Sequence, residues 1–370
     1  MSIQQPVFSK TRSEVPPDAR VIDFVEGGLR ELFFIQNPQF KKEMPTAAEP
    51  LKEFLSTQKN EGVWIYLPWN NEAIHCLPEE LYYKLRTARN RNIINDTEQT
   101  NYRNLSVGIA GLSVGSAILS ALVVSGGPKR LKIADFDTIE ISNLNRIHAK
   151  ITDLGANKAE VAARNVWGLD PFAELSVWSS GVSKENIEDF ITGSPKLDIF
   201  IDEMDSIDLK IISRLVCKKL KVPVLMATDN GDGIILDVER FDLEPDRKIF
   251  HGLVQNEIDE NSPSDFANLD FKKWLKLATM IVHPDFLTEK MIDSIPQIGK
   301  VISAIPQLGT SASVAGAATS FVVRRIANKQ DMPSGRYTLN FEEAFIPGYK
   351  SPDSIKNREE KKKKFMEIFK

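Results

Sequence analysis

Short apolar runs alternate with amphipathic segments through the middle of this chain. The run 105–110 leads into a turn rich in glycine and serine, which is followed by an apolar segment with helical periodicity, 115–124. A second apolar run, 131–134, ends on Asp135. Apolar runs of this length, bounded by turn residues, are typical of buried strands. A strand, a glycine turn, a helix and a strand that ends in an acid together predict a βαβ unit that binds a nucleotide.

The same alternation continues as far as residue 245. Further strands are expected at 174–178, 197–201, 222–227 and 234–240, and further helices at 157–168, 183–191 and 207–220. Strands that alternate with helices predict a parallel sheet with helices on both faces. We therefore expect an α/β fold with a Rossmann-like doubly wound sheet, mostly parallel.

The flanking regions have different patterns. The N-terminal accessory region, 1–85, is expected to be irregular up to residue 20, then helical at 21–34, 51–56 and 78–86 with a strand at 62–67. After the nucleotide-binding domain, 86–245, we expect an extension of the same domain, 246–345, with helices at 271–283, 284–295 and 309–326 and a strand at 336–341. The small residues of 309–326 predict a buried helix that packs closely. Residues 346–370 form a charged tail, expected to be an exposed or frayed helix.

Composition narrows the class of protein. Of the 370 residues, 42% are hydrophobic and 26% charged, which is typical of a globular domain, and the net charge of −4 favours neither a nucleic acid nor an anionic membrane as partner. The two cysteines exclude a disulfide framework and a cysteine zinc site. We see no signal peptide and no apolar run long enough to span a membrane, so a cytoplasmic location is expected.

The glycine turn by itself is weak evidence for any one chemistry. A strict G-x-G-x-x-G pattern is absent, but Gly111, Ser113 and Gly115 would let backbone N–H groups approach a phosphate at the start of a helix. Asp135, at the end of the second strand, is placed to bind the two ribose hydroxyls. On these residues alone, an NAD(P)-dependent oxidoreductase is the favoured interpretation.

The polar residues around the turn point elsewhere. Asp135-Phe-Asp137 is followed by Ser142-Asn-Leu-Asn-Arg146, by Lys158 at the start of a helix and by Asp202-Glu-Met-Asp205, and it is preceded by Arg89-Asn-Arg-Asn-Ile-Ile94. This order resembles the ubiquitin-activating-enzyme-like adenylation family (ThiF, MoeB, HesA), whose pattern is R-Y-N-R-Q-I-I, D-x-D, S-N-L-x-R, a helix-opening lysine and D-x-x-D. The resemblance covers about 86–245 and continues more loosely to about 345.

The resemblance implies an ATP-dependent adenylyltransferase. Such an enzyme converts a carboxylate, here the C-terminus of a small protein or peptide, into an acyl-adenylate and releases pyrophosphate. Arg146 and Lys158 would hold the phosphates, because this reaction brings anions together. Asp205 would hold Mg²⁺, and Arg91 would be an arginine finger supplied by the second subunit of a homodimer.

Other positions have implied roles or simple structural alternatives. Asn143 would contact phosphate or ribose, Asp135 the ribose, and Asp137 would line the site. Asp205 directly precedes a predicted helix, so an N-cap is its alternative role. The sequence Asp229-Asn-Gly-Asp-Gly233 is interpreted as a turn, with a contact between Asp229 or Asn230 and substrate as the alternative.

The chain also departs from the family pattern. Many members carry two C-x-x-C pairs for zinc, and this chain has none, so no zinc is expected. Cys217 lies within a predicted helix and is interpreted as a buried apolar residue, and Cys76 lacks a basic partner other than His75. The adenylate would therefore pass to an external nucleophile. An NAD(P)-dependent oxidoreductase and a non-catalytic nucleotide-binding scaffold stay open as alternatives.

Overall fold

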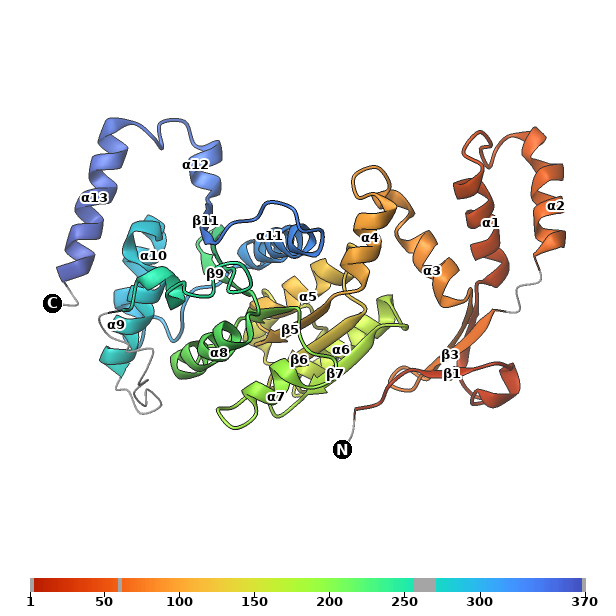
Figure 1. Cartoon of the computed structure of the whole chain (residues 1–370), viewed down its shortest axis with the longest axis horizontal. Helices are drawn as coiled ribbons and strands as arrows, with labels where there is room; N and C mark the ends of the chain where they lie inside the picture. Colours follow the sequence, from red (N-terminus) through yellow and green to blue (C-terminus); the bar gives the residue numbers. More distant parts are fainter. Residues whose placement is uncertain (1–2, 59–61, 256–270, 368–370) are drawn as a thin grey trace. The chain divides into compact units, whose positions relative to one another are not determined.

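The computed structural model describes residues 3–58, 62–255 and 271–367 (Figure 1). The chain forms two compact units. The first comprises 1–100 with 164–173, and the second comprises 101–163 with 174–370. We describe each unit by itself.

A seven-stranded sheet is the centre of the described part of the second unit. Its strands are β5 (Ser106–Ala110), β6 (Arg130–Ala134), β7 (Glu174–Trp178), β8 (Ile199–Asp202), β9 (Val224–Asn230), β10 (Gly233–Glu239) and β11 (Gly335–Leu339). They lie in the order β11-β10-β9-β8-β5-β6-β7. The strands from β7 to β9 run parallel, whereas β10 is antiparallel to both of its neighbours. The predicted mostly parallel, doubly wound sheet is confirmed.

The strand order reverses beside β5, which pairs with β6 on one side and β8 on the other. In open α/β sheets a ligand crevice forms at this switch point, outside the carboxyl ends of the strands. Every residue of β5, β8 and β10 is buried, which explains why apolar residues follow one another without alternation in β5 and β8, whereas β10 also carries the buried acids Asp237 and Glu239. The fold therefore places the ends of β5 and β8, where the polar motifs begin, at one edge.

Helices cover this sheet in two groups. They are α5 (Val114–Val124), α6 (Lys158–Leu169), α7 (Ile187–Thr192), α8 (Ile207–Leu220), α9 (Phe271–Val282) and α11 (Gly309–Ala327). Helices α5 and α11 pack against each other, and a Cβ atom added to Gly316 would lie 2.7 Å from the Ala117 carbonyl oxygen. The close approach predicted from the small residues of 309–326 is thereby confirmed. Helices α7, α8 and α9 contribute to a separate hydrophobic cluster around Phe190 and Phe200.

The C-terminal part of the second unit contains shorter helices. They are α10 (Glu289–Ser294), α12 (Phe341–Phe345) and α13 (Pro352–Glu367). The expected tail is helical and largely exposed, but Phe365 of α13 is only 2% exposed and packs with Leu287 and Met291. Lys361 of the same helix also pairs with Glu289 at 3.1 Å and Asp293 at 2.8 Å.

The first unit is built on a four-stranded sheet with the order β1-β3-β4-β2 in its described residues. The strands are β1 (Val7–Ser9), β2 (Arg20–Asp23), β3 (Val63–Leu67) and β4 (Glu72–Cys76), and the helices are α1 (Val25–Gln36), α2 (Ala48–Thr57), α3 (Glu79–Arg86) and α4 (Asp96–Arg103). The helix expected from residue 21 begins at Val25, because residues 20–23 pair with β4 as a parallel strand. Strands β1 and β4 were not predicted, since both are short and carry polar residues.

Residues 164–173 complete the first unit. Arg86 pairs with Asp170 at 2.9 Å, and both side chains are almost fully buried. The Tyr82 hydroxyl donates to the Leu169 carbonyl at 2.6 Å, and Phe172 packs its ring against Tyr82. The unit is therefore discontinuous in sequence.

Eight 3₁₀ turns link these elements in the described part of the chain. They are η1 (Arg12–Glu14), η2 (Pro45–Ala47), η3 (Ala88–Asn90), η4 (Ile141–Asn143), η5 (Ile151–Asp153), η6 (Ile249–Gly252), η7 (Pro284–Phe286) and η8 (Ile295–Gln297). Of these, η3 and η4 carry the arginine motifs singled out in the sequence.

Candidate functional site

The glycine turn crosses the switch point at the end of β5. Gly111 donates its N–H to the Ala134 carbonyl at 2.9 Å and has a φ of +89°. A Cβ atom at this position would lie 2.2 Å from the carbonyl oxygen of Glu203. Both the left-handed backbone and this close contact require glycine. Gly111 therefore joins the start of α5 to the segment that follows β8.

Asp135 fastens this turn to the end of β6. Its two carboxylate oxygens accept the N–H groups of Leu112 at 2.7 Å and Asp137 at 2.9 Å. Burial raises the pKa of the Asp135 carboxyl, although these two hydrogen bonds and the nearby Lys158 act in the opposite direction. The side chain is 8% exposed. Its first task in this fold is to position the glycine turn, and a ribose contact stays a prediction.

Arg146 lies over the N-terminus of α5. Its Nε donates to the Ser113 hydroxyl at 2.9 Å, and its Nη1 donates to the Ser142 carbonyl at 3.1 Å and to Asn145 Oδ1 at 2.9 Å. The buried Asn143 accepts the Glu140 N–H at 3.0 Å and so stabilises the turn that carries Arg146. The guanidinium is therefore held at the place where backbone N–H groups also favour an anion.

Lys158 is the first residue of α6 and pairs through its Nζ with Asp137 Oδ2 at 2.8 Å. The lysine side chain is 9% exposed and that of Asp137 is 51% exposed, so the lysine is nearly buried and its partner carboxylate is open to solvent. Sequence analysis missed Asn157, whose Oδ1 accepts the N–H groups of Ala159 and Glu160 at 2.9 and 3.2 Å. An asparagine just before a helix is a known N-cap signal that could have identified it.

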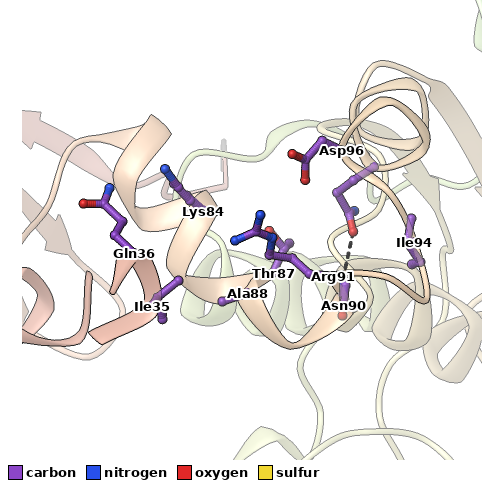
Figure 2. Close-up of a pocket in the computed structure, with 10 residues that line it drawn as sticks. Ile35, Gln36, Lys84, Thr87, Ala88, Asn90, Arg91, Ile94 and Asp96 are labelled. Carbon is purple, nitrogen blue, oxygen red and sulfur yellow. Dashed lines mark hydrogen bonds between the residues drawn. The ribbon is translucent and has the colours of Figure 1, made fainter. Parts of the chain in front are cut away.

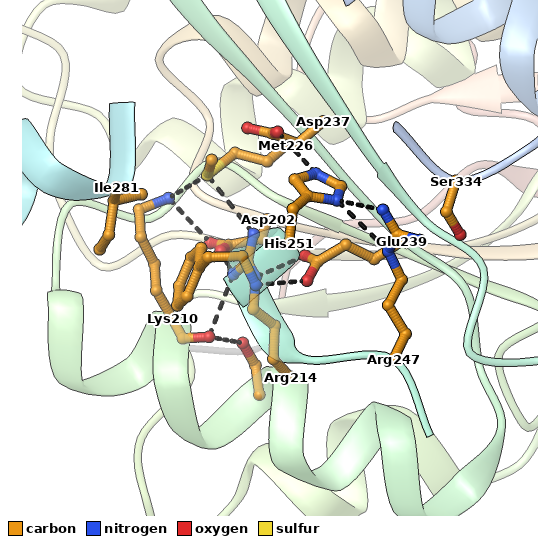
Figure 3. A network of polar contacts seen from close by, with 12 residues as sticks. Asp202, Lys210, Arg214, Met226, Asp237, Glu239, Arg247, His251, Ile281 and Ser334 are labelled. Carbon is orange, nitrogen blue, oxygen red and sulfur yellow. Dashed lines mark hydrogen bonds and ion pairs between the residues drawn. The ribbon is translucent and has the colours of Figure 1, made fainter. Parts of the chain in front are cut away.

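The two aspartates of Asp202-Glu-Met-Asp205 have different environments. Asp205 is exposed and makes no hydrogen bond or ion pair with any residue that the structure describes. Ser206 caps α8 instead, accepting the Leu209 N–H at 3.3 Å, so the N-cap role considered for Asp205 is wrong. Asp202 is fully buried and pairs with Arg214 and Lys210 (Figure 3). Of these two aspartates, only Asp205 is available to a metal ion.

Across residues 3–58, 62–255 and 271–367, no cluster of three or more histidines, cysteines or acids could enclose a metal. Mg²⁺ does not need such a cluster, because it is commonly bound by one or two carboxylates together with water and phosphate oxygens. The unpaired Asp205 carboxylate fits that type of ligation.

A buried charge network lies behind the site (Figure 3). Arg214 donates through Nε to Glu239 at 2.7 Å, and its guanidinium stacks 4.0 Å from the centre of the Phe250 ring. Glu239 also accepts the Phe250 N–H at 2.7 Å. Because Asp202 belongs to the same network, these contacts fix the position of the strand end that leads to Asp205.

His251 continues this network between Arg247 and Asp237. Arg247 lies 2.9 Å from His251 Nδ1, and an arginine can only donate hydrogen bonds. Nδ1 must therefore accept, which places the ring hydrogen on Nε2, 2.8 Å from Asp237 Oδ1. Asp237 is buried, and although burial acts to raise its pKa, His251 and Arg336 hold that pKa below its usual range.

Asp229 is a strand residue, so its interpretation as part of a turn is wrong. It lies in β9 opposite Ile234, and the turn is made by the next residues, with Gly231 at a φ of +71°. Its side chain is 5% exposed and neither carboxylate oxygen has a partner in good hydrogen-bond geometry. Burial raises the pKa of Asp229 to about 6, although Ser311, Arg146 and Gln307 act to lower it.

The remaining candidates lie apart or are inert. Arg91 belongs to the first unit, where it is exposed and ends the η3 turn. Cys76 and Cys217 are both buried free thiols. Burial raises the pKa of Cys76 to about 11 and that of Cys217 well above its ordinary value. Such thiols are poor nucleophiles at neutral pH, in agreement with the interpretation of Cys217 as a buried apolar residue.

Comparisons with known proteins identify the family of this chain. The ThiF family model matches residues 87–352. A Mycobacterium tuberculosis protein described as "Uncharacterized protein MT1398" is 37% identical over 277 residues, which cover 75% of this chain and 38% of that protein. The tRNA threonylcarbamoyladenosine dehydratase of Escherichia coli is 28% identical over 162 residues, covering 44% and 58% respectively. The chain thus spans less than two thirds of either relative.

Among solved structures, that of PaaA superposes with a TM-score of 0.49 at 18% identity, covering 71% of this chain and 77% of that one. None of the described helices has the length and apolar character that crossing a membrane requires.

The family model covers more than half of the chain and includes the motifs from Arg89 to Asp205. The resemblance seen in the sequence is confirmed, and this chain belongs to the ThiF family.

Proposed function

We propose that this chain uses ATP and Mg²⁺ to adenylate a carboxylate, releasing pyrophosphate. The observation that carries this proposal is the attachment of two cations to one glycine turn. Arg146 bonds directly to Ser113 of the turn. Lys158 pairs with Asp137, whose N–H is bound by the same Asp135 carboxylate that holds Leu112. A hydride transfer to NAD(P) would not need two cations here, whereas a triphosphate does.

The chemistry requires little from the protein beyond charge and position. A carboxylate oxygen of the substrate forms a bond to the α-phosphorus of ATP, and the bond from that phosphorus to the bridging oxygen of pyrophosphate breaks. The electron pair leaves with pyrophosphate, and no proton is transferred. Arg146 and Lys158 would offset the negative charge that gathers on the phosphate oxygens, together with the first N–H groups of α5. Mg²⁺ on Asp205 would supply further positive charge to the phosphates when bound.

We further propose a homodimer in which Arg91 acts on the nucleotide of the other subunit, as the family pattern implies. Arg91 supports this role by its exposure and by making no ion pair with any described residue. The test mixes the variants Arg91→Ala and Lys158→Ala, each inactive alone. If the arginine acts in trans, mixed dimers contain one complete site and recover up to about a quarter of the wild-type rate. No recovery would show that Arg91 acts within its own subunit or not at all.

Calorimetry separates the adenylation proposal from its rivals without knowledge of the substrate. We expect binding of ATP–Mg²⁺, and weaker binding by at least about tenfold in Lys158→Ala, the scale of one lost charged hydrogen bond. Binding of NAD(P) but not ATP would establish an oxidoreductase instead. Nucleotide binding without AMP formation, once a substrate is known, would establish a scaffold.

The proposed carboxylate is the C-terminus of a small protein or peptide. To identify it, Arg146→Ala is used as a trap in a cell extract, the bound molecules are analysed by mass spectrometry, and each is assayed with wild-type protein for exchange of labelled pyrophosphate into ATP. The E. coli relative is named for threonylcarbamoyladenosine in tRNA. Retention of RNA in place of a peptide, with exchange supported by that RNA, would replace the proposed substrate class by a nucleoside carboxylate.

A further inference from the structure

A cavity of about 370 Å³ lies within the first unit (Figure 2). Of the candidate site residues described above, its lining includes Arg91 alone. Its walls come from the end of α1, the last turn of α3, the η3 turn and the start of α4. The lining residues are Ile35, Gln36, Lys84, Thr87, Ala88, Asn90, Arg91, Ile94, Asp96 and Gln99. This volume lies within the range of small-ligand pockets.

Several polar groups of the wall are already committed to one another. The Asn90 amide donates to Gln99 Oε1 at 2.8 Å, and Gln99 donates in turn to the Tyr83 hydroxyl at 3.0 Å. The Thr87 hydroxyl donates to the Tyr83 carbonyl at 2.8 Å. These bonds connect η3 with α3 and α4, so they hold the shape of the wall.

The charged side chains of the wall, in contrast, are unpaired among the described residues. Lys84, Arg91 and Asp96 are exposed and form no hydrogen bond or ion pair through their side chains with any residue in the described ranges. Figure 2 shows the Arg91 side chain extending toward Lys84, with Asp96 on the other side. A lysine in the last turn of α3 is explained by the helix dipole alone. The dipole does not explain why a second unpaired cation shares its cavity.

We propose that this cavity binds the carboxylate of a peptide, which Lys84 and Arg91 hold together while Asp96 accepts an N–H group of the same molecule. The planar guanidinium can bind a carboxylate through two parallel hydrogen bonds, and the ammonium adds a third donor. Ile35 and Ile94 offer apolar contact to the rest of the ligand. A polyphosphate suits the cavity less well, because its several negative charges would face Asp96.

The proposal goes beyond adenylation, since it concerns a second site and needs no nucleotide. Substitution of Lys84 distinguishes this site from the proposed role of Arg91 as an arginine finger. An arginine finger requires only Arg91, whereas binding in the cavity requires both cations. Binding is therefore measured without ATP, and failure here would leave the adenylation proposal untouched.

The test is ligand-observed saturation-transfer NMR on the full chain. The probes are acetylated trialanine with a free carboxylate, the same peptide as its C-terminal amide, and pyrophosphate, the last followed by phosphorus line width. We expect the free acid to bind at least about tenfold more tightly than the amide and more tightly than pyrophosphate, and Lys84→Ala and Arg91→Ala each to weaken it about tenfold or more. Asp96→Asn should weaken the acid and strengthen pyrophosphate.

Arg89→Ala is the matched control, because this arginine is exposed in the same turn but does not line the cavity. It should bind the acid as the wild type does. All replaced side chains are exposed, and circular dichroism melting curves verify that each variant folds. Equal binding of acid and amide, unchanged binding in Lys84→Ala, tighter binding of pyrophosphate, or no binding of any probe would each overturn the proposal.

Discussion

Replacement of Arg214 by alanine should destabilise the fold more than most single substitutions. Arg214 is fully buried and bonds to two carboxylates, those of Asp202 and Glu239, which are themselves at most 1% exposed. Without the arginine, Asp202 keeps Lys210 at 3.2 Å and the Met204 N–H at 3.1 Å, whereas Glu239 keeps the Phe250 N–H and no cation among the described residues. At least one buried carboxylate therefore loses its countercharge.

The size of the loss follows from these contacts. Two charge-assisted hydrogen bonds contribute roughly 1.5–3 kcal/mol each. Breaking a buried ion pair by removing one partner typically costs about 3–5 kcal/mol. We therefore expect the free energy of unfolding to fall by about 3–5 kcal/mol, measured by urea denaturation at pH 7.

The triple variant Arg214→Met, Asp202→Asn, Glu239→Gln is the matched control. It removes all three fully buried charges and leaves only Lys210, whose side chain is 14% exposed, without its partner, so it should be more stable than Arg214→Ala. Burial acts to raise the pKa of Asp202, but Lys210 and Arg214 lower it overall. The stability gained from Asp202 is thus present above its ordinary pKa of 3.8 and is lost as the pH falls through the lower value. A loss below about 1 kcal/mol in Arg214→Ala, or equal loss in the triple variant, would refute the reasoning.

Three further outcomes are expected. Gly111→Ala should lower the free energy of unfolding by roughly 3 kcal/mol or more in urea denaturation, because its Cβ would lie 2.2 Å from a backbone oxygen. Gly155 is the control, since it also has a positive φ but nothing within 4 Å of an added Cβ, and Gly155→Ala should cost only about 1–2 kcal/mol. Burial raises the pKa of Asp229 to about 6, so the stability that this residue contributes as a neutral acid is fully present below about pH 4 and is lost as the pH rises through 6. Asp229→Asn should therefore gain up to about 3 kcal/mol on the wild type across this pH range, and a constant difference would contradict this. Long-range nitrogen–proton NMR should find the hydrogen of His251 on Nε2, and Arg247→Ala should leave it there because the Asp237 carboxylate still accepts it; a hydrogen on Nδ1 in the wild type would show that the arginine contact is misassigned.

The sheet of the second unit could be predicted because its strands are buried on both faces. Continuous apolar runs such as 105–110 and 197–201 are strong local signals, and the acids and glycines that follow them mark the carboxyl edge. The first unit was harder to predict, since β1 and β2 are exposed edge strands whose pairing depends on residues some 50 positions away. Local periodicity carries no information on such pairing.

The site residues also divide into those that local sequence signals predict and those that depend on distant packing. The motif positions Ser113, Asp135, Arg146 and Lys158 are joined through hydrogen bonds around the glycine turn, as their order along the strands suggested. Asp229 was missed because Asn-Gly and Asp-Gly are such strong turn signals that they obscured the strand residue just before them. No local pattern reports that a carboxylate is buried without a partner, since this depends on how α11 packs.

The discontinuity of the first unit has a consequence for synthesis on the ribosome. Arg86 and Tyr82 emerge from the ribosome long before their partners, Asp170 and Leu169. Between them the chain must deliver β5, α5 and β6, the beginning of the other unit's sheet. The N-terminal unit cannot reach its final packing until residue 173 has emerged, so the two units mature in an interleaved order and not one after the other.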